Sequence, residues 1–163
     1  MLITKENIDK FIYGTTTMNC YNKGITHIEY IPDNIIFLYC YNNKLTKLPK
    51  LPESLEYLHC YNNQLTKLPK LPKGLKAFDC SNNKLTKLPE IPNNVKRFYC
   101  DHNKLTKLPI LPENLTSLHC WENDLPYRVT LKRFKEHDIL SIKEHNTFLK
   151  RKKIINQIVN EKH

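Results

Sequence analysis

The cysteines of this 163-residue chain recur with a strict period of 20 residues, and this period constrains the fold more than any other feature. They stand at Cys20, Cys40, Cys60, Cys80, Cys100 and Cys120. The residues around them recur with the same period, since 55–72 read LEYLHCYNNQLTKLPKLP and 75–92 read LKAFDCSNNKLTKLPEIP. Such a period predicts a repeat architecture, in which each unit stacks on the next and a long, thin core runs through the stack.

Each unit is predicted to contain one short strand around its cysteine. The segment 57–61 reads YLHCY, and its apolar residues Leu58 and Cys60 are two positions apart, so they share one face of a strand. The aromatic residues between and beside them face the other way. We expect leucine and cysteine to point into the stack, since they form the apolar face of the strand. A register slip by one residue would exchange the buried and exposed faces, so the register should be strongly fixed.

The rest of each unit is predicted to be a turn and an extended return leg. One asparagine recurs in five units, and its side chain carries both a donor and an acceptor, so stacked copies should form a hydrogen-bond ladder at the turn. These residues are Asn43, Asn63, Asn83, Asn103 and Asn123. The phrase L-P-x-L-P follows, in which two prolines fix φ at about −65° and exclude a regular helix. The return leg should therefore be extended, close to polyproline II.

The even number of cysteines does not indicate disulfides here. Equivalent residues on neighbouring parallel strands lie about 4.8 Å apart and point the same way. A disulfide needs Cβ atoms about 3.8 Å apart on converging vectors. We expect six buried thiols that act as small core hydrophobes, which fits a reducing compartment.

The complete pattern, L-x-x-L-x-C-x-x-N-x-L-x-x-L-P-x-L-P with two spacer residues, resembles the short, 20-residue class of leucine-rich repeat. The resemblance covers residues 15–131, and LTKLP recurs intact at 45–49, 65–69, 85–89 and 105–109. The cysteine and the near-identical units are similar to leucine-rich repeat proteins of giant amoebal viruses, and the pattern is also similar to effectors of enteric bacteria.

This resemblance implies an α/β repeat fold that is mostly β and extended. The implied structure is a right-handed solenoid with a concave parallel sheet, an extended or polyproline convex side, and helical N- and C-terminal ends. It also implies that the concave side binds other proteins, while the repeats themselves rarely catalyse a reaction.

Three segments are expected along the chain. Residues 1–14 form an N-terminal helical cap, 15–126 a solenoid of about six repeats, and 127–163 a basic helical cap or tail. The last segment holds ten basic and four acidic residues, so it carries +6 of the chain's +10.

Both ends of the stack are predicted to be closed by helices, because stack ends expose apolar surface. The spacing of apolar residues from Ile8 to Ile12 predicts a short amphipathic helix N-capped by Thr4. The C-terminal segment lacks proline and shows helical spacing, which predicts helices over 130–142 and 144–161.

The outward strand positions are the candidate partner-binding surface. They are Phe37, Tyr39, Tyr41, Tyr57, His59, Tyr61, Asp79, Arg97, Tyr99, Asp101, His119 and Trp121, beside smaller residues such as Ala77 and Ser117. Unlike the core positions they vary between units, as a tailored binding face would, and Tyr, Trp and Arg dominate interface hot spots. The simpler alternative is that aromatic residues favour strands and pack on one another. The expected ligand is a protein segment, a host factor if the protein is viral.

Basic residues offer an alternative, anion-binding surface. The densest cluster is Lys150, Arg151, Lys152 and Lys153. It would suit nucleic acid, an anionic surface or an acidic partner, or serve as a nuclear signal, although a solvated helix face is the simpler and favoured explanation. A second basic line, Lys47, Lys67, Lys87 and Lys107, is explained by solubility. A third alternative is an adaptor that recruits a substrate for an enzyme elsewhere.

No catalytic, cofactor or metal site is expected. His59 and His119 each precede a cysteine, but strand alternation puts histidine and cysteine on opposite faces. No C-x-x-C, H-x-x-x-H or glycine-rich phosphate loop occurs. The N-terminus lacks a signal-like apolar run, and no stretch approaches the ~20 apolar residues of a membrane span. We therefore expect a soluble, cytoplasmic protein that is not an enzyme, in the host cytoplasm if it is viral.

Overall fold

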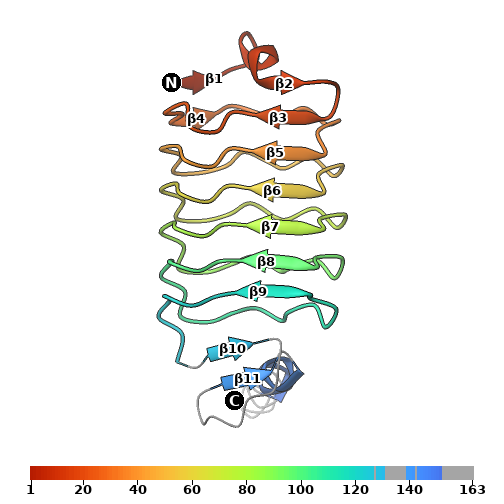
Figure 1. Cartoon of the computed structure of the whole chain (residues 1–163), viewed down its shortest axis with the longest axis vertical. Coiled ribbons are helices and arrows are strands. Elements are labelled where there is room, and N and C mark those ends of the chain that lie inside the picture. The colour runs from red at the N-terminus through yellow and green to blue at the C-terminus, as the bar shows by residue number, and fades with distance from the viewer. Residues whose placement is uncertain (127, 131–138, 142, 152–163) are drawn as a thin grey trace, which may run out of the picture.

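The computed structural model describes residues 1–126, 128–130, 139–141 and 143–151 as a stack of flat units (Figure 1). The strands are β1 (Leu2–Ile3), β2 (Ile12–Tyr13), β3 (Thr17–Asn19), β4 (His27–Ile28), β5 (Phe37–Tyr39), β6 (Tyr57–His59), β7 (Ala77–Asp79), β8 (Arg97–Tyr99), β9 (Ser117–His119), β10 (Arg128–Thr130) and β11 (Ile139–Ser141). A 3-10 helix, η1, spans Ile8–Phe11, and residues 143–151 are helical.

One strand per unit builds a seven-stranded sheet in the order β2-β3-β5-β6-β7-β8-β9. From β3 to β9 the strands are parallel, and each residue pairs with the residue 20 positions later, as Leu38 does with Leu58. This confirms the predicted repeat and its register. The strands have three residues, and the ladder continues beyond them because Cys60 N donates to Asp79 O (2.9 Å) and Asn62 N to Ser81 O (3.0 Å).

The leucine and cysteine positions form one continuous core, as predicted. All six cysteines are buried thiols, and Phe78 stacks on Phe98 inside the stack with ring centroids 5.4 Å apart. Burial raises the pKa of the Cys20 thiol to about 12. Burial also raises the pKa of the thiols of Cys40, Cys60, Cys80 and Cys100, so these five cysteines stay protonated at neutral pH and act as packing residues rather than nucleophiles.

The predicted asparagine ladder is present. In Asn63 the side-chain nitrogen lies within hydrogen-bond distance of the Cys40 carbonyl (3.0 Å) and the Cys60 carbonyl (3.1 Å), and Oδ1 accepts from Leu45 N (3.0 Å). The side chain thus satisfies backbone groups of two successive units. Asn83 and Asn103 repeat this arrangement.

The residue before each ladder position adopts a left-handed backbone, which the sequence reading did not anticipate. Its φ lies between 51° and 54° in all six units, at Asn22, Asn42, Asn62, Asn82, His102 and Glu122. Asparagine tolerates this region better than most side chains, which accounts for the Asn-Asn doublets.

The N-terminal end differs from the predicted amphipathic helix. It contains only the four-residue η1, whose N-cap is Asn7 and not Thr4; the Asn7 side chain does not cap the helix but accepts from Thr4 N through Oδ1 (2.9 Å). Strand pairing occupies the rest: β1 pairs with β4, and β2 pairs antiparallel with β3. Backbone hydrogen bonds to the first unit outweigh a longer helix here, and β2 covers the edge of the main sheet.

The C-terminal end also corrects one prediction. Residues 128–130 and 139–141 are the parallel strands β10 and β11, where a helix over 130–142 was predicted. β-Branched residues such as Val129 and Thr130 favour strands. The second predicted helix is present over 143–151, and the remainder of it lies outside the described residues. The boundaries 1–14, 15–126 and 127–163 stay predictions.

Candidate functional site

Three rows of outward side chains run along the main sheet, and together they form what we call the sheet face. The first row is Phe37, Tyr57, Ala77, Arg97 and Ser117; the second is Tyr39, His59, Asp79, Tyr99 and His119; the third is Tyr41, Tyr61, Ser81, Asp101 and Trp121. In-register pairing brings each row together. All twelve predicted partner-binding residues therefore lie on one face.

Rings stack along the rows in the N-terminal half of the sheet face. Phe37 and Tyr57 have ring centroids 4.7 Å apart, and Tyr41 and Tyr61 are 4.5 Å apart, with nearly parallel planes in both pairs. Tyr21 extends the third row, 4.8 Å from Tyr41, and the sequence reading missed it because the first unit departs from the pattern. The rings do pack on one another, but they remain partly exposed.

A second aromatic cluster lies at the C-terminal end of the rows. His119 contacts Tyr99 with centroids 4.5 Å apart and Trp121 at 4.3 Å. Trp121 is the single tryptophan of the sequence and is 53% exposed, although tryptophan side chains are highly buried on average. An exposed indole held by a neighbouring ring is the type of side chain that anchors protein interfaces.

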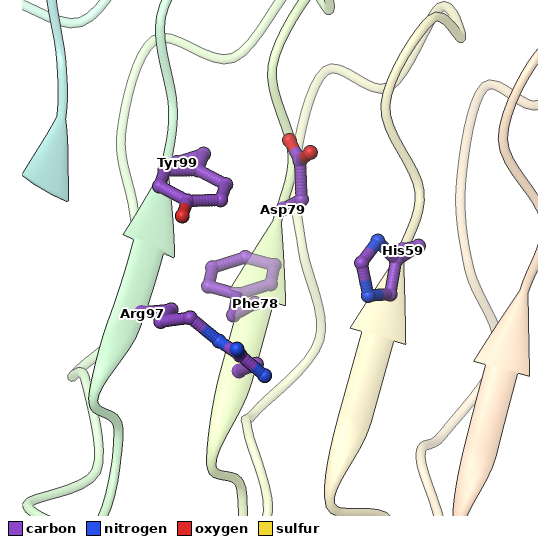
Figure 2. A pocket seen from close by; sticks show the side chains of 6 residues that line it. His59, Phe78, Asp79, Arg97 and Tyr99 are labelled. Carbon is purple, nitrogen blue, oxygen red and sulfur yellow. The ribbon is translucent and has the colours of Figure 1, made fainter. Parts of the chain in front are cut away.

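Between the two clusters the fourth unit leaves a recess over β7. Its outward residues Ala77, Asp79 and Ser81 are small, and a pocket of about 280 Å³ is lined by His59, Ala77, Phe78, Asp79, Arg97 and Tyr99. Figure 2 shows His59 and Tyr99 on opposite sides of this recess, on β6 and β8. Asp79 Oδ1 accepts a hydrogen bond from Ser81 N (3.0 Å).

Burial shifts the titration of the groups in the recess. Desolvation raises the pKa of the Asp79 carboxyl above its ordinary value, and it lowers the pKa of the His59 imidazole. His59 is therefore neutral at pH 7 and does not supply a positive charge beside Asp79. A second pocket of about 570 Å³ shares Arg97 and is also lined by Tyr57, Lys76 and Lys96.

The alternative anion-binding residues are only partly described. Lys150 and Arg151 are exposed at the end of the helical segment, while Lys152 and Lys153 lie outside the described residues. The four lysines of the second basic line are exposed.

Within the described ranges there is no group of three His, Cys, Asp or Glu residues placed to hold a metal ion. In the same ranges no helix has the length and apolar character needed to cross a bilayer. His59 and Cys60 point to opposite faces of the sheet, as predicted, since His59 is half-exposed and Cys60 is buried.

A family model for pairs of leucine-rich repeats matches residues 33–73 and 53–93. The repeats of this chain are leucine-rich repeats. The matched residues hold the same strand, asparagine ladder and return leg as the units around them, so the leucine-rich repeat pattern extends through the main sheet. No match was found among curated proteins.

Solved leucine-rich repeat structures share this fold. YopM from Yersinia enterocolitica WA-314 is 25% identical with a TM-score of 0.67, covering 77% of this chain and 32% of YopM. A Shigella effector leucine-rich repeat domain is 28% identical with a TM-score of 0.68, covering 80% of this chain and 57% of that domain. YopM from Yersinia pestis, a leucine-rich effector protein, is 33% identical with a TM-score of 0.59, covering 69% and 38%.

The chain thus spans from about a third to just over half of the length of these proteins. The resemblance to bacterial effectors is confirmed, and the resemblance to viral proteins stays a prediction. Leucine-rich repeats are generally protein-interaction scaffolds, and residues 33–93 match this class of repeat.

Proposed function

We propose that the sheet face binds a segment of another protein. The observation that carries this proposal is the contrast within each unit, where the core and ladder positions are nearly constant while the three outward positions change. A face that served only packing would have no physical reason to differ from unit to unit while the core beneath it stays the same.

Stacked rings also suit a binding surface energetically. A ring already held against its neighbour loses little side-chain entropy when a partner covers its free side, so less of the contact energy is spent on ordering. Tyr57 and Tyr61 are held in this way on one side of the recess, and Trp121 on the other.

The effector resemblance suggests where such a partner resides. We propose a host-cell protein in the cytoplasm as the target, which agrees with the six reduced thiols. We propose binding without catalysis, either directly or as the recruiting part of a larger assembly.

Affinity purification with the full chain tests the proposal. The variants Tyr57→Ala, Tyr61→Ala and Trp121→Ala should each weaken a captured protein partner by about tenfold or more, as expected for truncated hot-spot residues. A surface control is Ile110→Ala, which removes an exposed apolar side chain from a return leg, away from the sheet face. Retention of the partner by all three variants would contradict the proposal.

Charge reversal of residues 150–153 separates the alternative. It should leave binding through the sheet face unchanged. If the chain instead binds nucleic acid or an anionic surface, that binding will fall steeply with salt and be lost on charge reversal, since phosphate contacts depend on counterion release.

A further inference from the structure

The recess over β7 has the dimensions of a single side chain. Its walls stand on β6 and β8, which are two strand spacings or about 9.6 Å apart. Its volume of about 280 Å³ falls just below the roughly 300–1,000 Å³ of pockets that enclose whole small molecules. It is therefore suited to one side chain of a larger partner rather than to a cofactor.

The floor of the recess carries a negative charge. Figure 2 shows the Asp79 carboxylate and the Arg97 guanidinium on opposite sides of Phe78, so that Arg97 reaches across the start of β7 and away from Asp79. The ion pairs found among the described residues join Lys76 to Glu56 and His102 to Asp101, and neither includes Asp79. Asp101 adds a second carboxylate close to Asp79. Ser81 links the two, since its backbone N donates to Asp79 and its Oγ donates to Asp101 Oδ1 (2.9 Å).

These groups discriminate between kinds of incoming side chain. An apolar side chain would remove the remaining water from the carboxylate without replacing its hydrogen bonds, and that desolvation is unfavourable. An acidic side chain placed at Asp79 would be repelled by its carboxylate. A cation can pair with the carboxylate and place its flat or methylene surface against the rings of His59 and Tyr99.

We propose that the recess over β7 receives a basic side chain of the bound protein segment, arginine in preference to lysine. The cationic group lies at Asp79, and the stem lies between His59 and Tyr99. Arginine is preferred because its planar guanidinium both stacks on rings and bonds a carboxylate with two donors. This proposal rests on the proposed function of the sheet face.

A random library of short displayed peptides, selected against the full chain, tests the proposal without knowledge of the natural partner. Selected peptides should share a basic residue. Replacing that arginine by citrulline, which keeps the shape and removes the charge, should weaken binding by about tenfold to a hundredfold, the range of a charge-assisted hydrogen bond.

Three variants of the chain locate the effect. Asp79→Asn keeps the acceptor for Ser81 N and removes the charge, so it should weaken arginine peptides as much as citrulline does. Asp33→Asn makes the same chemical change at an exposed turn and should bind like the natural chain. Ala77→Tyr places a ring where the preceding units carry Phe37 and Tyr57, so it should fold normally and block the recess.

The outcomes separate this inference from the function on which it rests. Peptides that need Tyr61 and Trp121 but show no basic residue, or that bind Asp79→Asn equally well, would overturn the basic-side-chain proposal and leave the sheet face as a binding surface. Failure to select any peptide that depends on the sheet face would overturn both.

Discussion

At the scale of single residues, the same left-handed backbone conformation occurs once in each of the six units, and different side chains occupy it. The position before each ladder asparagine has a left-handed φ, and asparagine occupies it in the first four units. His102 and Glu122 occupy it in the last two. A side chain other than glycine or asparagine costs about 1 kcal/mol or more in this region, so these two positions are where the stack is least well adapted.

Replacing Glu122 by asparagine should therefore stabilise the protein. We expect the free energy of unfolding to rise by about 0.5 to 1 kcal/mol, as at other positions where backbone strain is relieved. Urea unfolding with an unchanged slope measures this. Glu122→Ala is the matched control, because alanine removes the same charge and keeps the strain, so an equal gain from alanine would rule out the backbone explanation.

Asp79 illustrates the opposite case, a residue whose charge costs stability. Its pKa is raised in the folded protein by burial, so the folded state binds the proton more tightly than the unfolded state, and stability falls as pH rises through the raised pKa. The penalty is therefore larger at pH 7 than below the ordinary pKa of the carboxyl. Asp79→Asn should consequently raise the melting temperature at pH 7 and give no gain below the ordinary pKa of the carboxyl. A lower melting temperature at pH 7 would show that the carboxylate is a stabilising group.

The sequence predicted the ladder asparagines and missed the left-handed residues for a physical reason. Asn63 has a buried donor and acceptor whose partners follow from the period alone, whereas the backbone conformation of Asn62 depends on how tightly the chain turns. The Asn-Asn doublets at 42–43, 62–63 and 82–83 could have predicted the left-handed residues, since the ladder explains only the second asparagine of each doublet and leaves the first without a role.

At the scale of elements, the middle of the stack follows from its sequence and the ends do not. A strand such as β6 has a neighbour of the same pattern on each side, so one unit predicts the next. The end segments pair with something unlike themselves. The N-terminal residues join the first unit from two sides, as β1 on β4 and β2 on β3, and helical periodicity cannot reveal that pairing.

The helical segment 143–151 docks on the return leg of the fifth unit through two buried polar residues that the sequence reading did not single out. Asn146 Oδ1 accepts from Leu111 N (2.9 Å) and its Nδ2 donates to Leu111 O (2.7 Å). Asn146→Ala would leave both backbone groups buried without these partners, so we expect a loss of about 2 to 4 kcal/mol in the free energy of unfolding. Asn94→Ala, which removes an exposed side-chain bond to Lys73 O, is the control and should cost less than about 1 kcal/mol. Equal losses in chemical denaturation would show that the helix is not docked in this way.

The neighbouring His145 should make this docking sensitive to acid. It is fully buried, its Nε2 bonds the Pro109 carbonyl (2.9 Å), and burial lowers its pKa below the ordinary 6.5. The unfolded state therefore takes up the proton first, and stability is lost as pH falls from 6.5 toward the lowered pKa. Hydrogen exchange of residues 143–151 should accelerate between pH 7.5 and the acid side of this window, after correction for the intrinsic rate. His145→Gln should abolish that dependence, and its persistence in the variant would assign it to another group.

At the scale of the whole molecule, the core residues are nearly the same in every unit, whereas the residues of the sheet face differ from unit to unit. The core is specified by the repeated leucines, cysteines and asparagines, so almost any unit could replace another there. The rows of the sheet face are not interchangeable, since the recess described above lies over the fourth unit and the tryptophan stands in the sixth. The fold was therefore predictable from one unit, whereas the recess required the side chains of three units placed together.

Removal of one complete unit tests whether the units are interchangeable in the core. Deleting residues 44–63 joins Asn43 to Gln64, which is equivalent to Lys44, and removes β6 while each remaining strand keeps a neighbour of the same register. Because each unit contacts chiefly its neighbours, the shortened chain should still unfold cooperatively, with a denaturant slope reduced by about an eighth. The recess should survive as well, since Tyr39 would take the place of His59 beside Asp79, and peptides with arginine should still bind. Deleting only 44–53 removes half a period, including the return leg that carries the chain from β5 back to the start of β6, so that variant should not fold. If the 10-residue deletion folds as well as the 20-residue deletion, the 20-residue unit is not what stabilises the stack. The in-register pairing that builds the sheet face would then be contradicted.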